Sequence, residues 1–90
     1  MENNKLPSAR SLTWDERIDF QEKGLDPQFW TSEEKQTRTN GKWEREMIVF
    51  IMETMFPDVN YKKLPYSEIA SLAHKCLRIT AGVDVEEKNS

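Results

Sequence analysis

One segment limits what this chain can fold into more than any other: WEREMIVFIMETMF, from Trp43 to Phe56. Nine of its fourteen residues are apolar, although only 37% of the whole chain is hydrophobic and 32% is charged. The segment does not alternate apolar and polar residues, and it stops before Pro57, so its length and pattern predict a helix. We therefore expect an all-α fold, a small bundle of three to four helices around this central apolar helix.

Apolar side chains surround nearly the whole circumference of the predicted helix when residues are placed 100° apart. Only Glu46 and Glu53 mark a narrow polar stripe. One side, which we expect to face the core, carries five residues: Met47, Ile48, Ile51, Met52 and Met55. The other apolar residues point away from that side: Trp43, Val49, Phe50 and Phe56.

Two interpretations of this helix remain open, and they are compatible with each other. Either its neighbours in the chain cover it on all sides, or the fold leaves part of Val49, Phe50 or Phe56 uncovered for another chain, including a second copy. The three methionines of the helix favour the second interpretation, because flexible thioether side chains adapt to varied apolar partners. The predicted partner-binding residues are Trp43, Val49, Phe50 and Phe56.

Two shorter helical elements are expected before this segment. Thr13 and Glu16 have the spacing of a capping box and Gly24 supplies a stop, which predict a helix near residues 14–23. Its main face, from which Phe20 is excluded, carries three residues: Trp14, Ile18 and Gln21. In LDPQFW, the Asp-Pro pair suits the N-cap and first position of a single 3₁₀ turn, and we expect its Phe29 and Trp30 to fold back on the core.

The clearest helix lies in LPYSEIASLAHKCLRITAG, between Pro65 and Gly82, and it has one polar and one apolar face. The chain is short enough for one domain, and we divide it into a flexible leader (1–12), a single helical domain (13–82) and an acidic flexible tail (83–90). A stretch of twelve residues without an apolar side chain, residues 31–42, lies within the domain, and we expect a polar loop there, with a mobile linker or a fully exposed helical turn as alternatives.

Chemistry-bearing residues are sparse. The one histidine, His74, falls on the polar face of the last helix, where we expect a solvated imidazole, and the one cysteine, Cys76, falls on the apolar face, where we expect an inert thiol. The carboxylates lack the spacing of a calcium loop, and the three glycines are isolated, so no phosphate-binding loop is predicted. We expect no enzyme activity, no metal and no cofactor.

Charge and hydropathy restrict the location and the partners. The net charge of −3 argues against nucleic-acid binding through a basic field. The uninterrupted apolar run from Met47 to Met52 is far shorter than the roughly 20 residues that cross a bilayer, and the polar N-terminus is unlike a signal peptide. We therefore expect a cytosolic protein without a membrane partner.

Three segments in this order resemble a known family: ARSLTWDERIDFQEKGLDP, then WEREMIVFIMETMFP, then LPYSEIASLAHKCLRITAG, which together cover about residues 9–82. They resemble the small tail assembly chaperones of long-tailed bacteriophages, in particular of phages that infect Gram-positive hosts. The likeness is a pattern of segments. It transfers no ligand motif, so the predicted site residues rest on helical geometry alone.

The resemblance implies a non-catalytic protein in the host cell cytoplasm. Such chaperones bind apolar helical segments of the tape measure protein, in several copies, and keep it soluble until the tail tube assembles. A second hypothesis is a small phage-encoded inhibitor that masks a basic site on a host enzyme with its acidic residues: Asp15, Glu16, Asp19, Glu33 and Glu34. A third is a DNA-binding regulator, which the charge balance disfavours.

Overall fold

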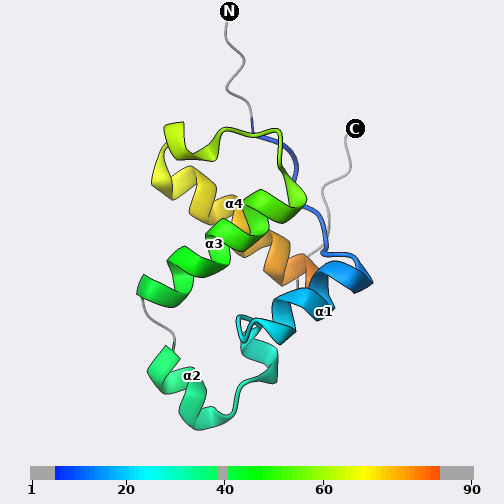
Figure 1. The fold of residues 1–90 in the computed structure, drawn as a ribbon, viewed down its shortest axis with the longest axis vertical. Coiled ribbons are helices and arrows are strands. Elements are labelled where there is room, and N and C mark those ends of the chain that lie inside the picture. The colour runs from blue at the N-terminus through cyan, green and yellow to red at the C-terminus, as the bar shows by residue number, and fades with distance from the viewer. Residues whose placement is uncertain (1–5, 39–40, 84–90) are drawn as a thin grey trace, which may run out of the picture.

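The computed structural model describes residues 6–38 and 41–83 of the 90-residue chain. Within these ranges the chain forms helices and no strands, which confirms the predicted all-α class (Figure 1). The elements follow one another as α1 (Trp14–Glu22), η1 (Pro27–Phe29), α2 (Ser32–Arg38), α3 (Gly41–Met55), η2 (Tyr61–Lys63) and α4 (Tyr66–Thr80), where η marks a 3₁₀ helix.

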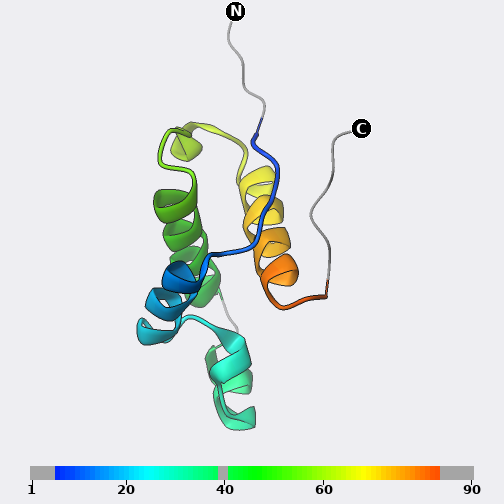
Figure 2. The same ribbon diagram turned by 90° about the vertical axis from the view of Figure 1, so that its right-hand side faces the viewer.

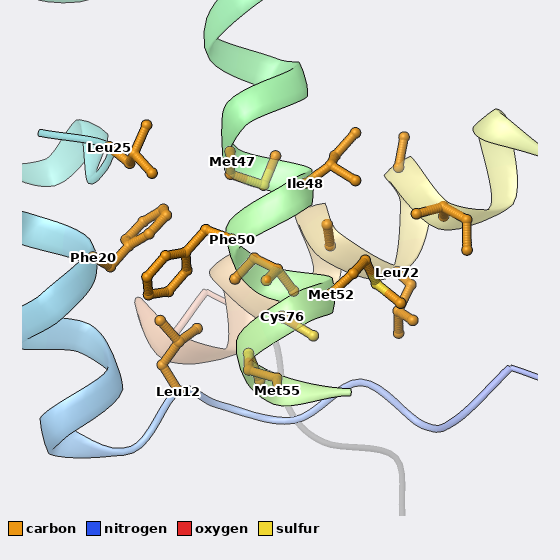
Figure 3. Packing of buried hydrophobic residues seen from close by; sticks show 14 residues of the cluster. Leu12, Phe20, Leu25, Met47, Ile48, Phe50, Met52, Met55, Leu72 and Cys76 are labelled. Atoms are coloured by element: carbon orange, nitrogen blue, oxygen red, sulfur yellow. The ribbon is translucent and has the colours of Figure 1, made fainter. Parts of the chain in front are cut away.

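Helix α3 is the centre of the fold. It packs side by side with α4, and α1 crosses its other flank (Figure 2). Six of its side chains are buried, and they include the whole predicted core face: Met47, Ile48, Phe50, Ile51, Met52 and Met55. The core is completed from the other elements, mainly by Leu12, Phe20 and Leu25 on one flank and by α4 on the other (Figure 3).

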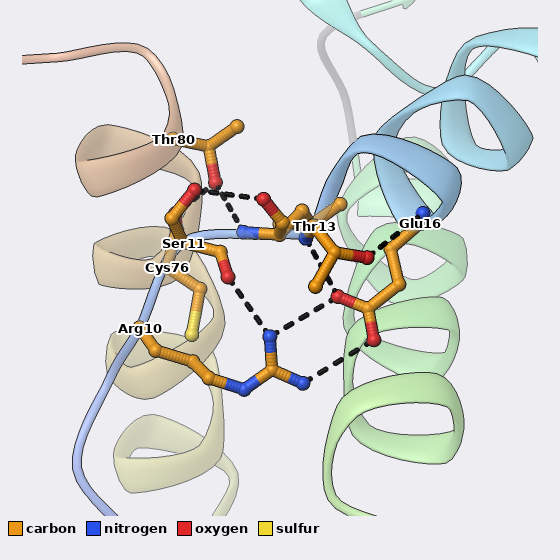
Figure 4. A network of polar contacts seen from close by, with 7 residues as sticks. Arg10, Ser11, Thr13, Glu16, Cys76 and Thr80 are labelled. Atoms are coloured by element: carbon orange, nitrogen blue, oxygen red, sulfur yellow. Dashed lines mark hydrogen bonds and ion pairs between the residues drawn. The ribbon is translucent and has the colours of Figure 1, made fainter.

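The segment before α1 belongs to the fold, which corrects the predicted flexible leader over residues 1–12. Leu12 is buried, and its backbone N–H donates a hydrogen bond to Thr80 Oγ1 at 2.8 Å. Arg10 donates two hydrogen bonds to the carboxylate of Glu16, at 3.1 and 3.2 Å (Figure 4). These contacts join the segment to the end of α4 and to the start of α1. The first five residues lie outside the described part of the chain.

Helix α1 turns a different face to the core from the one predicted. The capping box at its start is present, but Phe20 is its buried residue, only 1% exposed, and its ring centre lies 5.1 Å from that of Phe50. Trp14 is 80% exposed and Ile18 is 36% exposed. The rotation of α1 is fixed by the residues that precede it, since Leu12 is hydrogen-bonded to Thr80 and Arg10 to Glu16. A helical wheel of α1 alone does not include these contacts.

Element η1 begins as predicted. The carboxylate of Asp26 accepts a hydrogen bond from the backbone N–H of Gln28 at 3.1 Å, and it also pairs with Arg17 at 3.1 Å. Only one of the two aromatic residues folds back on the core: Trp30 is buried, whereas Phe29 is 67% exposed. The indole N–H of Trp30 donates to the backbone carbonyl of Gly24, just after α1, at 3.0 Å.

The segment predicted as a polar loop over residues 31–42 contains α2, so of the three alternatives the exposed helical turn describes it and the loop does not. The backbone N–H of Glu34 donates to Thr31 Oγ1 at 3.1 Å, and the backbone N–H of Thr31 donates to Glu34 Oε1 at 2.9 Å, which is a second capping box. An ion pair between Arg38 and Glu34 adds to it at 3.5 Å. Helix α2 buries none of its residues, so its cap stabilises it more than packing does.

Helix α4 forms where it was predicted. It starts directly after Pro65, and Gly82, with φ of +82°, follows its end. Four residues of the predicted apolar face are buried, Ile69, Leu72, Ala73 and Cys76, and so is Ala70, whereas Leu77 and Ile79 are half-buried. The exposed Val83 is the last described residue, so the rest of the predicted acidic tail (83–90) lies outside the described residues.

Candidate functional site

Three of the four residues predicted to bind a partner, Trp43, Val49 and Phe50, line two adjoining hollows beside α3, whereas Phe56 lines neither of them. Phe50 is only 7% exposed and packs against Phe20, so the prediction that its ring is uncovered is wrong. The physical reason is that α1 lies along this flank of α3 and supplies an aromatic partner for the ring (Figure 3). Val49, the preceding residue, is 38% exposed, more than any other large apolar side chain of α3.

Trp43 and Phe56 are half-buried at opposite ends of α3 and have partners within the chain. The indole N–H of Trp43 donates to the backbone carbonyl of Leu25 at 2.9 Å, and its ring meets that of Trp30 edge-on, with centres 5.7 Å apart. The guanidinium of Arg10 lies 5.9 Å from the ring centre of Phe56. These two aromatic residues therefore hold neighbouring segments against α3.

The methionines of α3 also belong to the core. Met47 and Met52 are completely buried, and Met55 is 6% exposed. Their side chains belong to the buried cluster around α3, and none of them lines the hollows described below (Figure 3). The prediction that these methionines favour an adaptable binding face is therefore wrong, because all three side chains are buried in the core and are not available to a partner.

A groove with an apolar floor lies between α1 and α3. It has a volume of about 590 Å³ and includes Leu25, Val49 and the edge of Phe50. Its remaining lining is charged or polar: Asp19, Lys23, Arg45, Glu46, Glu53 and Thr54. An apolar floor with a charged rim is the arrangement of grooves that accept one face of an amphipathic helix.

Two contacts fix the orientation of side chains on this rim. On α1, Lys23 pairs with Asp19 at 3.4 Å, one helical turn away. On α3, Glu53 Oε2 accepts a hydrogen bond from the Tyr61 hydroxyl at 2.7 Å. Burial, and after it this hydrogen bond, raises the pKa of Tyr61 to about 12, so the hydroxyl stays protonated and donates at neutral pH.

The groove continues toward α2. A smaller hollow of about 240 Å³ shares Lys23, Leu25 and Glu46 with it and adds Lys42 and Arg38 to the rim. Within residues 6–38 and 41–83, neither Lys42 nor Arg45 forms an ion pair. Since Lys42 and Glu53 are eleven residues apart on α3, the combined groove runs for about 16 Å, and its rim carries both cations and carboxylates along this length.

A polar cluster links α3 to α4 on another face. Glu44 Oε2 lies 2.9 Å from His74 Nε2, and Glu44 Oε1 accepts a hydrogen bond from the Tyr66 hydroxyl at 3.0 Å. The hydrogen bond from His74, followed by that from Tyr66, lowers the pKa of Glu44. The prediction of a solvated imidazole is therefore corrected: His74 is 35% exposed and paired.

Cys76 is a buried thiol, as predicted, and burial raises its pKa, which keeps it protonated and unreactive. In the described ranges there is no group of three or more His, Cys, Asp or Glu side chains that could hold a metal ion. None of the helices formed there has the length and apolar character needed to cross a membrane. No protein-family model, curated protein or solved structure matches this chain.

Proposed function

We propose that this chain is a non-catalytic tail assembly chaperone of a long-tailed bacteriophage. In this role it binds apolar helical segments of the tape measure protein in the host cell cytoplasm and keeps that protein soluble until the tail tube assembles. The observation that carries the proposal is the groove between α1 and α3, whose apolar floor includes the exposed Val49. The order of apolar and polar segments in the sequence supports the same role.

The dimensions of the groove suit a helical ligand. Arg45 and Thr54, which line its α3 side, are nine residues apart, so this side extends for about 14 Å, or about two and a half turns of a bound helix. A helix docked there would place its apolar stripe on Leu25 and Val49 and its polar flanks beside the charged rim. A soluble protein can therefore cover short apolar stretches of a long client helix.

A shallow groove with one exposed valine provides only modest binding energy for each copy. That is suitable for a chaperone that must leave when tail-tube subunits arrive. Several copies on one long client add their effects through avidity, while each copy dissociates separately. The net charge of −3 per chain would help to keep such a complex soluble.

The acidic residues invoked for an enzyme inhibitor do not favour that function. Three of the five are paired with cations of the same chain: Glu16 with Arg10, Asp19 with Lys23 and Glu34 with Arg38. Two of these carboxylates, Glu16 and Asp19, lie on α1, and Glu34 lies on α2. No observation favours a DNA-binding regulator either.

Co-expression with a tape measure protein tests the proposal. The chain should be produced together with the tape measure protein encoded beside its own gene, and the soluble fraction of the tape measure protein should be measured. Val49→Glu is expected to abolish the gain in solubility, because it introduces a charge on the apolar floor of the groove. Val83→Glu is the matched control, since Val83 is an exposed valine that does not line this groove.

The outcomes are distinct. Solubilisation by the native chain and by Val83→Glu, but not by Val49→Glu, supports the proposal, provided that circular dichroism shows both variants folded. Equal solubilisation by all three chains would place the binding surface elsewhere. A tape measure protein that stays insoluble with the native chain, or a genome with no tape measure gene beside this one, would contradict the proposed function itself.

A further inference from the structure

A second hollow lies between α1 and the end of α4, and we call it the α1–α4 cavity. Its volume is about 240 Å³, it is more enclosed than the α1–α3 groove, and it shares no lining residue with that groove. Most of its surface is apolar. The apolar residues of its wall come from segments far apart in the sequence: Leu12, Phe20, Pro27, Trp43, Leu77, Ala81 and Val83.

The one carboxylate in the wall of this cavity is already neutralised. Asp26 is 5% exposed and accepts hydrogen bonds from Arg17 Nε at 3.1 Å and from Gln21 Nε2 at 3.2 Å. It accepts a third from the backbone N–H of Gln28, at 3.1 Å, and Arg17 also donates to the side chain of Gln28. Arg78, the second arginine of the wall, interacts within the chain as well. These charged groups are therefore engaged with the protein itself.

The other polar side chains of the wall also have partners. Thr80 Oγ1 donates to the backbone carbonyl of Cys76 at 2.8 Å and accepts the backbone N–H of Leu12 at 2.8 Å. His74 pairs with Glu44 at 2.9 Å. Within residues 6–38 and 41–83, no buried side-chain nitrogen or oxygen lacks a hydrogen-bond partner.

These saturated walls determine the chemistry of a ligand. A charged or hydrogen-bonding group that enters the cavity loses its hydration without gaining a partner, which is costly. A neutral apolar molecule has no such cost and gains the burial of its surface. An apolar cavity of about 150 Å³ is large enough to bind benzene, so one of about 240 Å³ also has room for a molecule of two fused rings.

We propose that the α1–α4 cavity binds a small neutral aromatic molecule of one or two rings. The side chains of Phe20 and Trp43 in its wall offer offset or edge-on contacts to such a ring. Because Phe20 belongs to α1 and Leu77 to α4, the ligand contacts both helices and stabilises the folded chain. A molecule of this size binds weakly, with a Kd of roughly 0.1 to 1 mM.

An NMR titration of the full chain with indole tests the site, and indole-3-carboxylate is the matched probe that adds a charge to the same rings. Indole is expected to bind saturably and to give intermolecular NOEs to the methyl groups of Leu12 and Leu77, which line the cavity. NOEs to Leu25 and Val49, which line the α1–α3 groove, are expected to be absent. The carboxylate is expected to bind at least about tenfold more weakly, because the wall leaves it no partner.

A pair of alanine variants provides the second measurement. Ala81→Leu places a larger side chain in the cavity and is expected to weaken indole binding by about tenfold or more. Ala9→Leu is the matched control, since Ala9 is also a half-buried alanine but lines no part of the cavity, and it is expected to bind indole like the native chain. Circular dichroism checks that both variants are folded.

Several results would overturn the proposal. They are a lack of saturable binding up to about 5 mM indole, well above the expected Kd, NOEs confined to the groove residues, and equal binding of indole and its carboxylate. Equal binding of indole by Ala81→Leu and by the native chain would also overturn it. The NOEs are measured on the native chain, so they decide the question even where a variant does not fold. Because the groove and the tape measure protein take no part in this experiment, each of these results leaves the proposed chaperone function standing.

Discussion

Phe50 is the residue on which the packing of α1 against α3 depends most. Its ring lies 5.1 Å from that of Phe20, and both side chains are almost completely buried. Val49, its neighbour in sequence, contributes to the floor of the groove and remains partly exposed. Two adjacent apolar residues therefore differ: Phe50 is part of the packed core, and Val49 is the one that the proposed function assigns to binding.

Alanine substitutions should separate these roles. Phe50→Ala is expected to lower the free energy of unfolding by about 3–5 kcal/mol, because it removes a buried ring and leaves a cavity beside Phe20. Val49→Ala is expected to lower it by less than about 1 kcal/mol, since the side chain is partly exposed. Urea unfolding followed by circular dichroism measures both values. Equal losses for the two variants would contradict the burial described above.

Glu44 should give the fold part of its dependence on pH. Hydrogen bonds from His74 and Tyr66 hold its pKa in the folded state below the ordinary value of 4.5. A lowered carboxyl pKa stabilises the fold above pH 4.5, and this contribution is lost as the pH falls through the folded-state pKa. Thermal unfolding of the native chain and of Glu44→Gln between about pH 3 and pH 7 measures it. The native chain is expected to lose more stability toward low pH, and parallel profiles would contradict the prediction.

The helices α1 and α2 begin with the same capping motif but differ in how they are held. Thr13 and Glu16 cap α1, which buries Phe20 in the core, whereas Thr31 and Glu34 cap α2, which buries nothing. In the sequence, the first capping box predicts a helix. The second has the same spacing, but the absence of apolar residues obscured it, because hydrophobic periodicity is the stronger signal.

Removing each cap should therefore have different consequences. Thr13→Ala is expected to lower the free energy of global unfolding by about 1 kcal/mol, because α1 unfolds together with the core. Thr31→Ala is expected to leave global unfolding unchanged and to speed amide hydrogen exchange within α2 alone. Thermal unfolding and hydrogen exchange measure the two effects. A lower melting temperature for Thr31→Ala would show that α2 is part of the cooperative core.

At the scale of the whole molecule, local patterns predict the elements but not their rotation. The apolar segment around Ile51 predicts the central helix, and the two-faced pattern around Cys76 predicts α4, because each pattern is set within one helix. The orientation of α1 depends on Arg10 and Leu12 and on their contacts with Glu16 and Thr80, which are tertiary. The scattered apolar residues before α1 give no periodic signal for these contacts.

The candidate site could be predicted only in part for the same reason. Val49 was selected because the predicted helix carries more apolar surface than one face can bury, and it does line the groove. The sequence predicts an uncovered Phe50 because the helical wheel of α1 turns Phe20, the residue that covers its ring, away from the core. The rim residues on α1, Asp19 and Lys23, become part of the site only when that helix has its correct rotation.

The central claim is that the α1–α3 groove binds an apolar client helix, and the three valines of the described chain allow a direct test. Val49 lines the groove, whereas Val59 is half-buried and Val83 exposed, both outside it. Methyl NMR spectra of valine-labelled protein should be recorded while an apolar helical segment of the tape measure protein is added. We predict that the Val49 methyl signals shift in proportion to binding while those of Val59 and Val83 stay in place. Shifts at Val59 or Val83 with Val49 unchanged would contradict the account.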